Sequence, residues 1–271
     1  MLNIVYCCND KIFDGLYLSI LSILKRTKHS INFYILTGDL TVINPNYQPF
    51  SNKHISILKQ MIKSFNKQNT LTVYDAGKRY LSSFGKVDIA KVTPYNMFKL
   101  FIPEYEYHGN ELLYIDTDTM TNGDIAIAFD VDMTKAELCV CHVYNIQLVF
   151  GKDTTYFNGG VFLMNLDLIR KNHYFEKALD YYLKNKPLTL EEAALNKTWT
   201  AIKFWPNEFR FNYQKPGIEK DTIIKHFVNP LTSGQFIKIK QWDIAGVQNW
   251  LNLHNWDEDY KYFLEQKKHW K

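Results

Sequence analysis

Leu112-Leu113-Tyr114-Ile115-Asp116-Thr117-Asp118 joins an apolar run to two acids, and this combination is the strongest structural signal in the chain. Four apolar residues in a row predict a buried strand, and the alternating acids that follow predict a loop that faces solvent. Two carboxylates at the end of a strand can bind one hard cation, such as Mg²⁺ or Mn²⁺, and leave positions open for substrate phosphates. The stretch therefore predicts metal-assisted chemistry on a phosphorylated substrate, with a solvated acidic turn as the alternative.

Strand and helix patterns alternate up to this stretch. We predict strands at 3–8, 31–36, 71–74 and 112–115, and helices at 16–24, 55–65 and 95–102, the last of which ends at Pro103. This order predicts an α/β fold with a mainly parallel, Rossmann-like sheet and helices on both faces. Ligands of such sheets bind at the carboxyl ends of the strands. Cys8 and Asn9 should therefore lie at the same edge as Asp116 and Asp118.

The second half is less regular. It predicts a strand at 137–141, a glycine-bearing turn that enters a strand within 157–164, a helix at 174–183 and a short strand at 223–227. A second acidic pair, Asp130-Val131-Asp132, follows no apolar strand and is interpreted as structural. We expect one domain at 1–240 and an aromatic-rich extension at 241–271. Its tryptophans and lysines suit either peripheral membrane contact or packing against the domain.

Composition sets the broad class of protein. The 271 residues are 46% hydrophobic, which allows a sizeable core, yet no apolar run reaches the length of about 18 residues that a transmembrane helix needs. The N-terminal residues read as a first strand rather than a secretion signal. The four cysteines, in apolar runs without metal-binding spacing, predict buried reduced thiols in a cytoplasmic protein. The net charge of +4 is modest and no nucleic-acid-binding motif accompanies it, so no nucleic-acid partner is predicted.

Four blocks in a fixed order give the chain a likeness to a known family. It resembles glycosyltransferase family 8, the retaining enzymes of the GT-A fold that include glycogenin and bacterial lipopolysaccharide galactosyl- and glucosyltransferases. The likeness spans residues 3–230. The blocks are Val5–Asp10, Lys99–Pro103, Leu113–Met120 with Gly123-Asp124 downstream, and Phe157–Leu166.

The resemblance implies a substrate and a set of site residues. The enzyme would move a hexose, galactose or glucose, from a UDP-sugar to a glycan, lipid-linked or protein acceptor. Asp116, Asp118 and His226 would hold Mn²⁺ or Mg²⁺, which would neutralise the donor diphosphate and stabilise UDP as it leaves. Asn158 would bind the sugar or the acceptor. The expected nucleotide-binding residues are Cys8 and Asn9 at the uracil, Lys99 near the nucleotide or its phosphates, and Tyr114, Ile115, Asp116, Thr117 and Asp118.

Two departures from the family pattern affect this assignment. Where the family carries an Asp-Gln pair beneath the anomeric carbon of the sugar, this chain has Glu191 and Glu192. Two acids in a first helical turn are also favourable for the helix itself. After His226 the chain lacks the lysine of the family's Lys-Pro-Trp motif at its usual spacing. Lys225, Lys238 or Lys240 would have to replace it.

Two other functional hypotheses remain open from the sequence. A phosphatase of the haloacid dehalogenase type also places two aspartates after an apolar strand, but usually after the first strand of its sheet. A non-catalytic relative that binds a sugar nucleotide or a glycan would be compatible with both departures.

Overall fold

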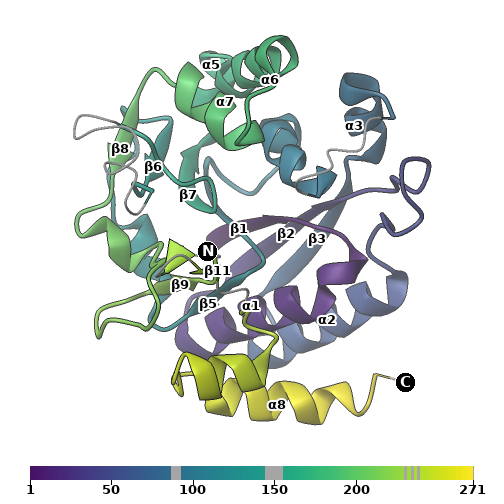
Figure 1. The fold of residues 1–271 in the computed structure, drawn as a ribbon, viewed down its shortest axis with the longest axis vertical. Coiled ribbons are helices and arrows are strands. Elements are labelled where there is room, and N and C mark those ends of the chain that lie inside the picture. Colours follow the sequence, from purple (N-terminus) through teal and green to yellow (C-terminus); the bar gives the residue numbers. More distant parts are fainter. Residues whose placement is uncertain (87–92, 144–154, 229–230, 233–234, 237–238, 271) are drawn as a thin grey trace.

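A seven-stranded sheet forms the centre of the computed structural model, which describes residues 1–86, 93–143, 155–228, 231–232, 235–236 and 239–270 (Figure 1). The strand order is β3-β2-β1-β4-β7-β6-β8. All adjacent strands are parallel except β7, which runs antiparallel to β4 and β6. The predicted α/β fold with a mainly parallel sheet is confirmed. The strands are β1 (Leu2–Cys7), β2 (Ile31–Thr37), β3 (Thr70–Asp75), β4 (Glu111–Ile115), β6 (Leu138–Val140), β7 (Val161–Asn165) and β8 (Ile202–Phe204).

Strand β1 shows why helices must cover both faces of this sheet. Its side chains alternate between the faces, as they do in every strand. Ile4 and Tyr6 belong to one buried cluster, and Val5 and Cys7 belong to the other. Because both faces are apolar, each requires its own layer of helices.

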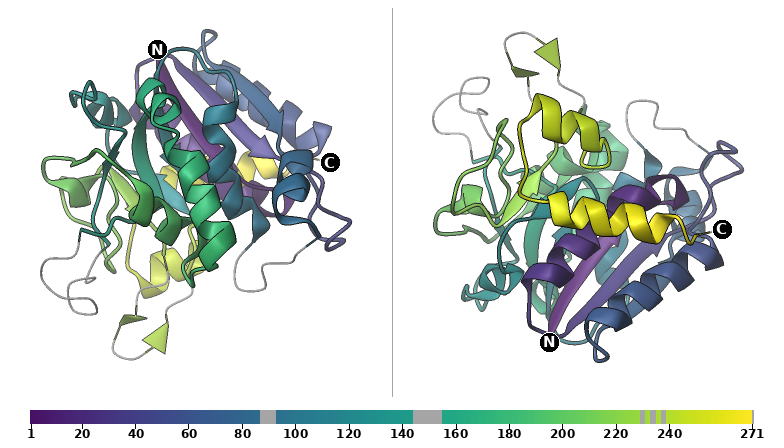
Figure 2. Two further views of the ribbon diagram at one scale, coloured as in Figure 1. Left: turned by 90° about the horizontal axis from the view of Figure 1, so that it is seen from above. Right: turned by 90° about the horizontal axis from the view of Figure 1, so that it is seen from below.

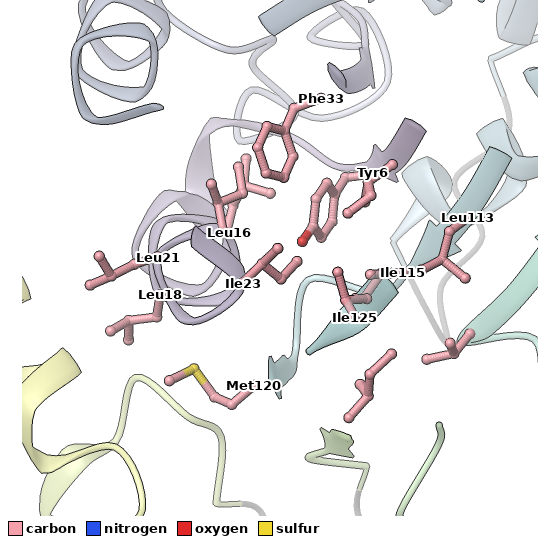
Figure 3. Close-up of a cluster of buried hydrophobic side chains, with 14 of the residues drawn as sticks. Tyr6, Leu16, Leu18, Leu21, Ile23, Phe33, Leu113, Ile115, Met120 and Ile125 are labelled. Atoms are coloured by element: carbon pink, nitrogen blue, oxygen red, sulfur yellow. The ribbon is translucent and has the colours of Figure 1, made fainter. Parts of the chain in front are cut away.

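The first helical layer contains α1 (Phe13–Arg26), α2 (Asn52–Phe65) and α8 (Asp257–Lys267). Leu16 of α1 packs against Tyr6 and Phe33 of the sheet (Figure 3). The buried Tyr6 hydroxyl is 3.0 Å from the Ser19 hydroxyl, which is itself 3.0 Å from that of Thr119. These three hydroxyl groups are therefore paired with one another, as burial demands.

The second layer covers the opposite face. Its aromatic core lies around Tyr95, Phe98 and Phe101. The helix predicted at 95–102 is a 3₁₀ helix that continues through Pro103 to Glu104, where the Pro103 carbonyl accepts a hydrogen bond from Arg170 at 2.9 Å. The layer consists of η2 (Pro94–Glu104), α3 (Gly77–Phe84), α5 (Leu166–Lys171), α6 (Tyr174–Asn185) and α7 (Leu190–Thr198).

Within residues 241–270, α8 packs against α1 (Figure 2). Trp256 is fully buried and its indole donates to the Thr121 carbonyl at 2.8 Å. Arg26 donates to both carboxylate oxygens of Asp259, at 3.2 and 2.8 Å. The aromatic residues of this segment therefore pack mainly against the domain, with the exception of Trp250, which is 84% exposed. The boundary at residue 240 stays a prediction.

Smaller elements complete the described part of the chain. They are η1 (Asp10–Ile12), β5 (Thr119–Thr121), η3 (Ile125–Phe129), η4 (Glu208–Arg210), β9 (Ile224–His226), β10 (Leu231–Thr232), β11 (Gln235–Phe236) and the π-helix η5 (Gly246–Trp250). All four cysteines are buried and none forms a disulfide. Within the described ranges, no helix combines the length and the apolar character needed to span a membrane.

Candidate active site

Three potential metal ligands meet beyond the carboxyl end of β4. Asp116 and Asp118 follow that strand directly, and His226 ends β9, which pairs with β5 so that His226 lies opposite Thr119. The Nε2 atom of His226 is 3.1 Å from Asp118 Oδ1 and 3.7 Å from Asp116 Oδ2. One ligand atom from each residue lies within 4.8 Å of the others. The structure thus brings together the three residues that the sequence analysis grouped.

A buried asparagine orients the histidine of this cluster. Asn212 is fully buried, and its side-chain oxygen is 2.9 Å from His226 Nδ1. Because an amide oxygen only accepts, Nδ1 carries a proton, and Nε2 faces the two carboxylates, where its lone pair would serve as a ligand once a cation is bound. The sequence analysis missed Asn212, since a lone asparagine between two aromatic residues carries no metal-binding signal.

Gly160 lets the backbone pass close to two of the three ligand candidates. A Cβ atom at Gly160 would lie 2.2 Å from His226 Cε1 and 2.9 Å from Asp116 Oδ2, so only glycine fits there. Two carboxylates and one imidazole form a mixed oxygen and nitrogen donor set that suits Mn²⁺ and that Mg²⁺ can also use. The residues present therefore fit a divalent cation.

One of the three candidate lysines lies at the cluster. Lys240 donates to Asp118 Oδ2 at 2.5 Å and to the Phe227 carbonyl at 2.7 Å. Although burial opposes it, His226 and Lys240 hold the pKa of Asp118 well below its usual range. Lys225 instead is buried between aromatic rings, and burial lowers its pKa to about 7. Lys238 lies outside the described residues.

Lys99 is buried beneath the cluster rather than solvated. It is 2% exposed, and its ammonium is 3.2 Å from Asp116 Oδ1 and 3.0 Å from Glu191 Oε1. It also donates to the Gly159 carbonyl at 3.1 Å. Burial disfavours its charge, but the two carboxylates outweigh this effect and raise the pKa of Lys99. Lys99 therefore bridges the carboxylates of Glu191 and Asp116.

Glu192 contacts the amide group of Gly159, whose carbonyl group contacts Lys99. Its Oε2 accepts from the Gly159 amide at 2.9 Å and from Asn158 Nδ2 at 3.2 Å, and burial raises its pKa to about 7. Asn158 Oδ1 in turn accepts from Asn212 Nδ2 at 2.9 Å. A continuous chain of hydrogen bonds therefore links the metal-ligand candidate His226 to Glu192.

A cavity of about 1040 Å³ opens above the acidic loop. Cys8, Asn9 and Thr117 line it together with the two aspartates. Tyr114 and Ile115 are each only 1% exposed, and the Tyr114 hydroxyl donates to Asp116 Oδ1 at 2.5 Å. Most of the expected nucleotide-binding residues therefore line the cavity, whereas Tyr114 and Ile115 are buried.

Comparisons with known proteins agree with this geometry. The sequence model of glycosyl transferase family 8 matches residues 3–230. A Haemophilus influenzae protein named "Putative glycosyltransferase" is 25% identical over 228 residues, which cover 78% of this chain and 63% of that relative, so the chain spans less than two-thirds of its length.

Solved structures share the fold. Galactosyltransferase LgtC in complex with donor and acceptor sugar analogs is 15% identical and has a TM-score of 0.69, with 95% of this chain and all of LgtC covered. An LgtC variant with an active-site glutamine replaced by glutamate gives a TM-score of 0.66 at 16% identity, covering 84% of this chain and 88% of that one. Glycosyltransferase GlyE of Streptococcus pneumoniae gives 0.61 at 15% identity, covering 98% and 64%.

The family match establishes the protein family, which the sequence motifs alone gave only as a resemblance. The family match covers the β1 loop, the acidic loop after β4, the Gly159-Gly160 turn and His226, so it includes most of the site described above. The match does not support the phosphatase alternative. The fold is the GT-A fold, and the chain belongs to glycosyltransferase family 8.

Proposed function

We propose that this chain is a metal-dependent hexosyltransferase that uses a UDP-sugar, with galactose or glucose as the sugar, and retains the anomeric configuration. The acceptor would be a glycan, lipid-linked or protein substrate. The observation that carries the proposal is the meeting of Asp116, Asp118 and His226 beside the cavity that the two aspartates line, where Lys240 also reaches Asp118.

The charged groups at this end of the cavity suit a diphosphate. Asp116, Asp118 and His226 would hold Mn²⁺ or Mg²⁺. Such an ion supplies Lewis-acid stabilisation of the departing UDP. Lys240 would exchange its contact with Asp118 for one with a donor phosphate, which gives it the role of the family lysine that is missing at the usual spacing. Lys99 would act indirectly, by fixing the carboxylate of Asp116.

Glu192 is the proposed residue beneath the anomeric carbon. It lies next to Asn158 and Gly159, and the adjacent Gly160 lies against His226 and Asp116. Retention requires either a covalent glycosyl intermediate or a reaction on one face of the sugar. We favour an electrostatic role, in which the Glu192 carboxylate stabilises positive charge that develops on the sugar ring. Its short contacts to two donors hold the side chain in place for this role.

A screen of UDP-sugars for slow hydrolysis tests the proposal without a known acceptor. We expect one UDP-hexose to release UDP in the presence of Mn²⁺, with activity lost in chelator. The released sugar, observed by NMR before it equilibrates, should keep the anomeric configuration of the donor. Binding of UDP without turnover of any donor or acceptor would favour the non-catalytic relative. Absence of both binding and turnover would refute both functions.

A further inference from the structure

The far end of the cavity is built by residues that lie beyond the family match. The cavity runs from the acidic loop, past the β1–α1 loop, to Lys267 and Trp270. Trp270 lies three residues after the end of α8 and is half-buried. No motif in the sequence analysis gave this tryptophan a place in the site, because it is more than 150 residues from the acidic loop.

Contacts with α1 hold this wall in position. The indole of Trp270 packs edge-on against Phe13, with 5.0 Å between ring centroids. It lies tilted against Tyr17, with 4.9 Å between centroids. Lys267 forms an ion pair with Asp14, in the first turn of α1. Phe13 directly follows the β1–α1 loop that carries Cys8 and Asn9. Trp270 is therefore fixed against the start of α1, directly after the loop that is expected to meet the nucleobase.

The two ends of the cavity differ in charge. At the acidic loop, Asp116, Asp118 and Lys240 suit a cation and a diphosphate. At the other end the acids already have partners. Asp14 pairs with Lys267, while Asp10 accepts from the Ser51 amide at 2.9 Å and lies 2.7 Å from His54 Nδ1. An aromatic wall whose neighbouring carboxylates are already paired suits a flat, uncharged ring.

We propose that Trp270 is the stacking surface for the nucleobase of the donor. This inference rests on the proposed function, because it assigns the base, the ribose and the diphosphate in that order from Trp270 to Asp118. The residues after α8 would then belong to the donor site rather than to a separate extension. Stacking of a base on an aromatic side chain changes affinity by about tenfold to a hundredfold when the ring is removed.

The test compares ligands that do and do not carry a base. With Mn²⁺ present, Trp270→Ala should weaken UDP and UMP binding by about tenfold or more, measured by calorimetry on the full chain. Binding of inorganic pyrophosphate with Mn²⁺ should stay unchanged, because pyrophosphate would occupy only the acidic end. Trp270→Phe, which keeps a ring, should restore most of the UDP affinity.

The matched control is Trp250→Ala, which removes an indole from the same segment where it is 84% exposed. It should leave all three affinities unchanged. Thermal melting of each variant would show that a loss of binding is not a loss of folding. Unchanged UDP affinity in Trp270→Ala, or an equal loss for pyrophosphate, would overturn the inference while leaving the proposed function intact. A parent chain that binds no uridine nucleotide would refute the proposed function, and this inference with it.

Discussion

Replacement of Lys99 by methionine should destabilise the folded chain strongly. The change keeps the length of the side chain but removes the ammonium that lies 3.0 Å from Glu191 and 3.2 Å from Asp116. The side chain of Glu191 is only 6% exposed, whereas that of Asp116 is 25% exposed and can be solvated. The main cost is therefore one uncompensated buried carboxylate, for which removal of a partner typically costs about 3–5 kcal/mol.

Urea unfolding at neutral pH measures this cost. We expect Lys99→Met to lower the free energy of unfolding by about 3 kcal/mol. The second change Glu191→Gln should recover part of the loss, since an amide needs no counter-ion. The control is Lys59→Met on the exposed face of α2, which should change stability by less than about 0.5 kcal/mol. A loss below about 1 kcal/mol for Lys99→Met, or no recovery with Glu191→Gln, would refute the buried-pair reasoning.

Three further outcomes follow from the same site. Glu192→Ala should reduce turnover strongly, with a smaller fall for Glu192→Gln and little change in donor affinity for either; full activity of the alanine variant would remove Glu192 from the mechanism. Because burial raises the folded pKa of Glu192 to about 7, its ionisation should destabilise the fold as pH rises from about 4.5 to about 7. Glu192→Gln should therefore gain stability relative to the parent across that window, by about 3 kcal/mol at pH 8, and parallel stability–pH curves would contradict this. Gly160→Ala should abolish Mn²⁺ binding in calorimetry, because its methyl group would meet His226; normal Mn²⁺ affinity would show that the cluster is not the metal site.

The strands and helices that could be predicted from the sequence are those whose patterns depend on residues close together in the chain. The apolar run at β4 and the alternating strand and helix patterns before it depend on neighbouring residues only, and they gave the parallel sheet. The carboxyl ends of β1 and β4 meet because those strands pair directly, with Val5 opposite Tyr114. The strand pattern and the rule that ligands bind at the carboxyl ends of parallel strands were therefore sufficient to predict this edge as the site.

The rest of the site depends on contacts that no local pattern encodes. Lys240 reaches Asp118 from more than 120 residues away, and a spacing rule alone could not choose it over Lys225. From the sequence pattern alone, Lys99 would be an exposed helix lysine, but in the structure it is buried and pairs with Glu191. Asn212 gains its role only because it lies against both His226 and Asn158. Partner choice of this kind is set by tertiary packing.

We propose that Asp116, Asp118 and His226 hold a divalent cation that binds the donor diphosphate. Calorimetric titration of UDP in the presence of Mn²⁺, and again in chelator, tests it most directly when the parent is compared with Asp118→Asn. The control is Asp132→Asn, in the exposed acidic pair that we interpret as structural. The account predicts tight binding only with Mn²⁺ for the parent and the control, and loss of that binding in Asp118→Asn. Equal UDP affinity with and without Mn²⁺, or an Asp118→Asn variant that binds as the parent does, would contradict it.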